Sequence, residues 1–206
     1  MGKPLIYVVY YSVYGHVRTL AKQSAEAINK SGHATAQLFK VQETLPPAVL
    51  EKIHAQKFDD PVLNPMDLPK ADGFLFGFPT RYGAPAGQMK SFWDGTGALF
   101  AKGSLAGKMG GAFTSTGSQH GGQETTIANF ISHYTHHGVI YVPIGYTSNI
   151  LNDNSELIGG SPWGAGTISG GDGSRKVSEK ELELAAHQGR YFAEILSKYH
   201  NGKASL

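Results

Sequence analysis

The chain has 206 residues, with 18 lysines and arginines against 16 aspartates and glutamates. This length fits a single domain covering residues 1–206. The near-balanced charge, without basic or acidic blocks, argues against nucleic-acid or membrane-surface binding. The absence of cysteine excludes disulfides and thiolate chemistry. We find no membrane span and no signal peptide, and therefore expect a cytoplasmic protein.

The first element is an apolar strand over residues 5–11, and a polar loop, Ser12–Val17, follows it. A helix with an apolar face from Val17 to Ile28 comes next and ends at Gly32. The loop therefore lies at the positive end of a helix dipole, where backbone N–H groups are available to an anion. Neither a G-x-x-x-x-G-K-[ST] nor a G-x-G-x-x-G pattern is present in this loop. The loop suits one phosphate monoester, and the alternative is an ordinary strand-to-helix turn that binds nothing.

Strands and helices alternate along the rest of the chain. We expect strands over 34–41, 73–78, 108–113 and 139–144, and helices over 47–55, 85–94 and 123–137, with a loop over 58–69. A glycine-rich insert without clear periodicity occupies about 143–177. A capping box, Ser178-Glu179-Lys180-Glu181, begins the last helix.

The five strands are continuous apolar runs, which indicates that helices cover both faces of the sheet. We therefore predict an α/β fold with a doubly wound, five-stranded parallel sheet of order 2-1-3-4-5 and a long insert after strand 5. Such a sheet binds ligands at the carboxyl ends of its strands. Three polar loops, at residues 12–17, 79–83 and 114–122, fall at such ends. This layout suits FMN on a flavodoxin-like sheet.

These loops also carry a resemblance that covers essentially the whole chain. Six segments in order closely resemble the WrbA-type NAD(P)H:quinone oxidoreductases, namely Ser12–Val17, Pro79–Gly83, Ser115–Gly117, Gly122–Glu124, His136–Gly138 and Gly170–Arg175. The resemblance implies FMN as cofactor and two-electron reduction of quinones by NADH or NADPH. Both substrates would use one flavin face in turn (ping-pong turnover), within a homotetramer whose sites include neighbouring subunits. The cofactor carries the chemistry, so no catalytic side chain is required.

The resemblance also assigns roles to individual residues. The phosphate would be held by Ser12, Val13, Tyr14, Gly15, His16 and Val17. The flavin ring would be edged by Thr80, Arg81, Tyr82 and Gly83, and on its other side by Ser115, Thr116, Gly117, Ser118, Gln119, His120 and Gly121. His136 would reach the flavin pocket, while Tyr14 and Phe100 would contact substrates.

Two segments depart from the family pattern. Phe100 stands where the family commonly has tryptophan, which leaves an apolar wall but removes an indole N–H. Ser118-Gln119-His120 replaces a glycine-rich stretch and is one residue longer. The Gly170–Arg175 run is expected to be architectural, closing the insert around a neighbouring subunit.

Other interpretations remain open at this point. His133, His136 and His137 suggest a metal, but no carboxylate or cysteine is placed to complete a familiar site, and we expect none. A one-electron flavodoxin-type carrier is a second possible function, although carriers are usually shorter and strongly acidic. An FMN-binding regulatory scaffold is a third.

Overall fold

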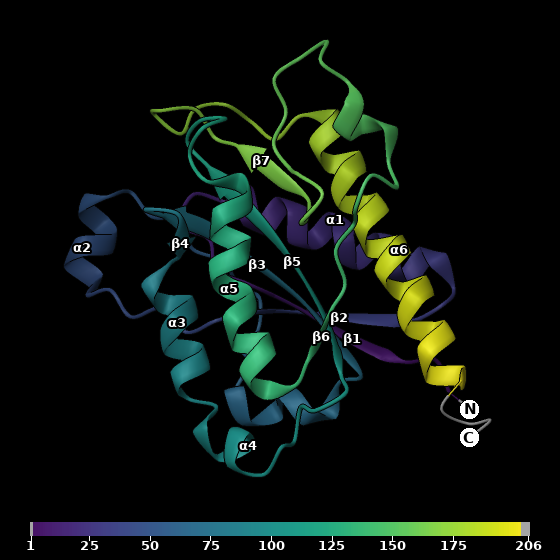
Figure 1. Ribbon diagram of the computed structural model, residues 1–206. Coiled ribbons are helices and arrows are strands. Elements are labelled where there is room, and N and C mark those ends of the chain that lie inside the picture. Colours follow the sequence, from purple (N-terminus) through teal and green to yellow (C-terminus); the bar gives the residue numbers. More distant parts are fainter. Residues whose placement is uncertain (1, 203–206) are drawn as a thin grey trace.

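A twisted sheet forms the centre of the computed structural model, which describes residues 2–202 (Figure 1). Hydrogen-bonded neighbours follow the order β2-β1-β3-β5-β6, with β4 paired to β3 and β7 paired to β5. The strands are β1 (Leu5–Tyr10), β2 (Thr35–Lys40), β3 (Gly73–Arg81), β4 (Ala84–Pro85), β5 (Met109–Thr116), β6 (Ile140–Tyr141) and β7 (Gly166–Ile168). All pairs are parallel except β3 with β4.

Helices cover both faces of this sheet, as the continuous apolar strands predict. In Figure 1, α3 and α5 lie on one face, and α1 and α6 lie on the other. The α-helices are α1 (His16–Ser31), α2 (Pro47–Lys52), α3 (Gly87–Asp94), α4 (Gly97–Ala101), α5 (Gln123–His137) and α6 (Glu179–Gly202). Two 3₁₀ helices, η1 (Pro65–Lys70) and η2 (Asn149–Asn152), complete the set within residues 2–202. None of these helices combines the length and apolar character needed to cross a membrane.

Each face has its own apolar core. Side chains alternate along β1, so that Tyr7 and Val9 point into one core and Ile6 and Val8 into the other. The first core is rich in aromatic side chains, which include Phe74, Phe76, Trp93, Phe130 and Tyr134. The second core joins α1 to α6 through Leu20, Ile28, Leu184, Phe192 and Leu196. The two cores fix the sheet between its helices and thereby fix where the loops after β1, β3 and β5 begin.

The predicted strand count is wrong, because the sheet has seven strands. The predicted order 2-1-3-4-5 becomes β2-β1-β3-β5-β6 in the numbering of the seven strands, because the two-residue β4 is an antiparallel partner of β3 and lies off the main path. The last position in the sheet is shared by two short strands. β6 pairs with Met109 and Gly110 at the start of β5, whereas β7 pairs with Thr114, Ser115 and Thr116 at its end.

The glycine-rich insert therefore lies largely between β6 and β7, the two strands that share the last position in the sheet, and does not follow that position. The strand expected over 139–144 is only Ile140–Tyr141, with one further ladder bond from the Val142 N–H to the Gly110 carbonyl at 2.8 Å. Pro143 has no N–H to continue the ladder, and Gly145 has a φ of 57°, which turns the chain away. The chain returns at Ala165, whose carbonyl accepts from the Thr114 N–H at 3.1 Å.

Two further boundaries differ from the prediction. The segment expected to be a loop over 58–69 contains the start of η1, where the Asn64 side chain accepts a hydrogen bond from the Met66 N–H at 3.0 Å. The strands β3 and β5 also run on to Arg81 and Thr116, so polar residues expected in loops lie in strands. Their backbone is held by the sheet, which places these polar side chains more firmly than a loop would.

The close approach of β3 and β5 leads to a stability prediction. A Cβ added at Gly77 would lie 2.0 Å from Cε2 of the buried Phe113 ring. We expect Gly77→Ala to lower the free energy of unfolding by about 1–3 kcal/mol, as overpacking of a core does. Chemical denaturation measures this change. Gly97→Ala is the control, because nothing lies within 4 Å of a Cβ at that helical position; an equal loss in both variants would contradict the packing argument.

Candidate functional site

A cavity of 330 Å³ lies at the carboxyl ends of β1, β3 and β5, where the predicted loops meet. This volume is within the range that small-molecule sites occupy. The cavity is lined by Ser12, Val13, Tyr14, His16, Val17, Pro79, Thr80, Arg81, Ser115, Thr116 and Gly117, and by the segment from Ser169 to Gly173. The topology thus brings together part of each predicted loop, and it adds a fourth segment that follows β7.

The loop after β1 has the geometry of an anion site. Gly15 is the N-cap of α1, with a φ of 93°, and no side chain caps the helix. No acidic residue occupies the first turn. The Ser12 hydroxyl accepts a hydrogen bond from the Gly15 N–H at 3.0 Å, which tightens the loop. The N–H groups of the first helical turn have no intrahelical partner, so they suit a phosphate group.

The backbone at position 15 favours glycine, because its left-handed φ is rarely adopted by other residues. A Cβ there would lie 2.9 Å from Oε1 of Gln56, the flexible end of a side chain that is able to move away. The segment carrying Gln56 is fixed against the loop by its backbone, because the Gln56 N–H donates to the Val13 carbonyl at 2.9 Å. The phosphate loop is therefore supported from outside by the segment that precedes Phe58.

The loop after β3 is a tight hairpin, and only some of the residues predicted to edge the flavin ring face the cavity. Tyr82 and Gly83 both have left-handed backbones, with φ of 56° and 77°, between the paired residues Arg81 and Ala84. This is the arrangement of a hairpin turn whose two central residues have positive φ. Thr80 and Arg81 line the cavity, whereas Tyr82 is fully exposed at the tip and Gly83 lies outside the lining. The Thr80 hydroxyl accepts from the Gly83 N–H at 3.1 Å and from the Thr126 hydroxyl at 2.7 Å.

The loop after β5 contributes only its first part to the cavity. Ser115 and Thr116 are buried at the strand end, and Gly117 follows them at the cavity wall. The Thr116 hydroxyl accepts a hydrogen bond from the Gln123 amide at 2.7 Å and donates to the Ser118 carbonyl at 2.7 Å. The remaining predicted contacts, Ser118, Gln119, His120 and Gly121, lie outside the lining within this chain.

Two predicted residues lie on other elements, away from the cavity lining. Phe100 is half-exposed on α4, and its ring lies 5.7 Å from that of His137, centroid to centroid. His136 is exposed on α5. Burial lowers the pKa of His137, with smaller contributions from the nearby His133 and His136. Within residues 2–202, no three histidine, aspartate or glutamate side chains come together as metal ligands.

Sequence reasoning missed the fourth wall, Ser169–Gly173. The Gly170–Arg175 run was expected to close the insert around a neighbouring subunit, which stays a prediction, and the structure places its first four residues in the cavity of their own chain. The placement follows from β7, because the Ser169 N–H donates to the Thr116 carbonyl at 2.8 Å. The run resembles the other three loops in its content of hydroxyl side chains and glycines, and this similarity could have indicated that it lines the same cavity.

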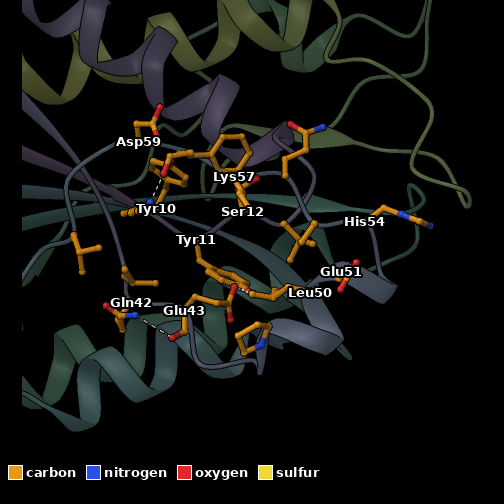
Figure 2. Close-up of a pocket in the computed structure, with 18 residues that line it drawn as sticks. Tyr10, Tyr11, Ser12, Gln42, Glu43, Leu50, Glu51, His54, Lys57 and Asp59 are labelled. Carbon is orange, nitrogen blue, oxygen red and sulfur yellow. Dashed lines mark hydrogen bonds between the residues drawn. The ribbon is translucent and has the colours of Figure 1, made fainter.

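A larger cavity, of 930 Å³, lies beside the first and shares only Ser12 and Val13 with it (Figure 2). Several of its polar groups are already paired: the Tyr10 hydroxyl donates to Asp60 at 2.6 Å, and the Tyr11 hydroxyl donates to Glu43 at 2.9 Å. Burial, followed by these carboxylate bonds, raises the pKa of both phenols. The smaller cavity is therefore the candidate site, since it contains the uncapped helix and the polar strand ends.

The donor set of the smaller cavity fits FMN. The uncapped start of α1 suits one phosphate monoester, and Thr80 and Ser115 offer hydroxyls beside it. Arg81 adds a positively charged guanidinium. This combination is able to bind a ligand with an anionic end and a polar-edged ring.

Comparisons with known proteins agree with this arrangement. The model of the family described as NADPH-dependent FMN reductase matches residues 10–149. The chain is 48% identical over 200 residues to the NAD(P)H quinone oxidoreductase PST2 of Candida albicans, covering 97% of this chain and 99% of that protein. It is 51% identical over 195 residues to the quinone-oxidoreductase QR2 of Triphysaria versicolor, covering 94% and 95% of the two chains.

A solved structure supports the fold. The chain superposes on a flavodoxin, WrbA-like protein from Agrobacterium tumefaciens with a TM-score of 0.66 at 22% identity, covering 95% of this chain and 99% of that one. The flavodoxin-like α/β fold predicted from the strand pattern is thereby confirmed. By the family match and by its relatives at about half identity over nearly full length, the chain belongs to the NADPH-dependent FMN reductase family.

Proposed function

We propose that this protein is an FMN-dependent NAD(P)H:quinone oxidoreductase of the WrbA type. The observation that carries the proposal is the single cavity in which an uncapped helix N-terminus meets the hydroxyl-rich ends of β3 and β5. Relatives at about 50% identity are named as quinone oxidoreductases, which supports the same activity here. When bound, FMN supplies the redox chemistry, since it accepts a hydride and passes two electrons on.

The chain's own residues bind and orient the cofactor and substrates. The Ser12–Val17 loop holds the phosphate through backbone N–H groups at the start of α1. Thr80 and Ser115, from neighbouring strands, would hydrogen-bond to the polar edges of the ring. Arg81 places a positive charge near the ring, which stabilises the negative charge of the reduced cofactor. Tyr14, which lines the cavity and is half-exposed, provides a contact surface for the nicotinamide.

Assembly as a homotetramer is part of the proposal. Three residues expected at the flavin site, Tyr82, Phe100 and His136, lie outside the cavity lining of their own chain and are accessible on its surface. An exposed aromatic side chain with a left-handed backbone, as at Tyr82, is an uncommon feature that favours a contact role. Contributions from neighbouring subunits would bring such residues to the site.

The first prediction concerns the phosphate. The purified protein should bind one FMN per chain, and riboflavin should bind about 100-fold more weakly, because it lacks the two or so charge-assisted contacts of the phosphate. Quenching of flavin fluorescence during titration measures both dissociation constants. Equal affinities for FMN and riboflavin would contradict the phosphate-loop assignment.

The second prediction concerns turnover. If NAD(P)H and quinone occupy the same cavity in turn, double-reciprocal plots of initial rate at several quinone concentrations should be parallel lines. Benzoquinone reduction with NADH and with NADPH, using FMN-loaded protein, provides the measurement. Intersecting lines would contradict a shared cavity. Failure of both nicotinamides to reduce the bound FMN would favour a one-electron carrier or a regulatory scaffold instead.

The third prediction concerns the substrate wall. Phe100→Trp enlarges an exposed ring on α4, so we expect the apparent affinity for bulky quinones to fall several-fold while FMN affinity is unchanged. Steady-state rates with benzoquinone and with a larger naphthoquinone test the size dependence. Met66→Trp is the control, because Met66 is similarly exposed but lies on η1, outside every segment assigned to the flavin site. The same shift in both variants would remove Phe100 from the substrate wall.

A further inference from the structure

One wall of the candidate flavin cavity belongs to the insert, and it has few side chains that could attach it to the rest of the protein. Ser169–Gly173 lines the cavity, and three of its five residues are glycines. Gly170 and Gly173 have left-handed backbones, and nothing lies within 4 Å of a Cβ built at Gly171 or Gly173. Glycine loses more conformational entropy on ordering than any other residue. The position of this wall therefore depends on how its two ends are attached.

The first end is attached to the sheet. The Ser169 N–H donates to the Thr116 carbonyl at 2.8 Å, and the Ser169 hydroxyl donates to the same oxygen at 3.2 Å. Thr116 is the last residue of β5 and itself lines the cavity. This end of the wall is therefore attached beside the part of the cavity that is expected to hold the flavin ring.

The second end, Arg175, is attached to the start of α1. The Arg175 N–H donates to the Ser169 carbonyl at 3.0 Å, which closes the wall into a loop. Its own carbonyl lies 2.7 Å from Nε2 of His16, the first residue of α1. Because a carbonyl only accepts, Nε2 carries the proton in this bond. The wall thus ends against the helix turn expected to hold the cofactor phosphate.

The side chain of Arg175 connects this end to the body of the insert. Nη1 donates to the Ile168 carbonyl at 2.6 Å and contacts both carboxylate oxygens of Glu181 at 3.0 and 2.9 Å. Nη2 donates to the Leu157 carbonyl at 2.8 Å. With the guanidinium fixed on one side and the carbonyl bonded on the other, Arg175 bridges α6 and α1.

Glu181 anchors the bridge. Its side chain is 0% exposed, and four groups besides Arg175 donate to its carboxylate. These donors are the Gly159 N–H at 2.9 Å, the Thr167 hydroxyl at 2.8 Å, the Ile168 N–H at 3.0 Å and the Ser178 N–H at 2.8 Å. A buried carboxylate is tolerated only when it is paired and fully hydrogen-bonded. Glu181 therefore fixes β7, the turn at Gly159 and the guanidinium of Arg175 relative to one another.

We propose that Glu181 and Arg175 are positioning residues for the phosphate of FMN. Neither lines the cavity; they act through the Arg175 carbonyl and His16, which hold the glycine-rich wall against the start of α1. This inference rests on the proposed function, because it assumes that FMN occupies the cavity. It predicts a larger effect at the phosphate end, which depends on the Arg175 carbonyl, than at the ring end, where β7 is also held by its pairing with Thr114, Ser115 and Thr116.

The test compares FMN with riboflavin in Glu181→Gln. The substitution keeps the volume but replaces one acceptor oxygen by an NH₂ donor, which faces groups that are themselves donors. We expect the dissociation constant of FMN to rise about tenfold, as the loss of one well-made contact does, while that of riboflavin stays within about twofold of the unsubstituted protein. Fluorescence titration gives both constants, and the ³¹P resonance of bound FMN reports the phosphate environment directly.

Glu183→Gln is the matched control, because Glu183 lies on the same helix and pairs with Arg190 at 2.6 Å on the surface. It should leave both constants unchanged. Arg175→Lys is the milder variant, since lysine keeps the charge beside Glu181 but lacks the fork that reaches Ile168 and Leu157 together. It should show the same selective loss to a smaller degree, and it carries the test if Glu181→Gln does not fold.

The outcomes separate the two proposals. If the unsubstituted protein binds no FMN, the proposed function fails, and this inference fails with it. If the protein binds FMN but both variants weaken FMN and riboflavin by the same factor, Glu181 and Arg175 have only a general structural role. Unchanged affinities in both variants would also overturn the inference. In these last two cases the proposed function stands.

Discussion

The site depends on the backbone N–H groups at the start of α1, which have no hydrogen-bond partner within the helix. A helix begins with N–H groups that its own carbonyls cannot reach, and here no side chain caps them. Their position is fixed because β1 lies in the middle of the sheet, between β2 and β3, with a core on each face. Gly15 allows the chain to turn from this strand into the helix within a few residues. The hydroxyls after β3 and β5 are useful to a ligand only because the same sheet holds them beside these N–H groups.

Much of this arrangement could be predicted from the residues, because the physical signals are local and strong. Continuous apolar runs mark strands covered on both faces, and the apolar face of α1 from Val17 to Ile28 was predicted correctly except for the buried Ala27. The capping box at the start of α6 was also predicted correctly: the Ser178 hydroxyl accepts from the Glu181 N–H, and the Glu181 carboxylate accepts from the Ser178 N–H. The division of the last strand position was not predictable, because β6 and β7 have two and three residues and carry no measurable periodicity.

The same distinction between long strands and other elements separates the predicted site residues that line the cavity from those that do not. Residues attached to long strands, such as Ser115 and Thr80, meet in the cavity because the sheet determines where strand ends lie. Residues on turns or helices, such as Tyr82, Phe100 and His136, are placed by hairpin geometry or helix packing, and within this chain they lie elsewhere. Their assignment to the site stays a prediction. The wall over Ser169–Gly173 was missed because its position depends on a buried carboxylate whose backbone and hydroxyl donors come from three separate stretches of chain, which no sequence spacing reveals.

The packing of α1 against α6 has a consequence for the order of folding. The Ser24 hydroxyl on α1 donates to the Ala185 carbonyl on α6 at 3.0 Å, and a Cβ at Gly189 would lie 2.6 Å from the Ser24 carbonyl oxygen. The two helices are about as far apart in the sequence as the fold allows, so their contact requires closure of a long stretch of chain. During synthesis, α1 emerges early, and its apolar face stays uncovered on this side until α6 has left the ribosome. Helix α1 is thus among the first helices made and among the last to be fully packed, which leaves this face open to chaperones and to aggregation during synthesis.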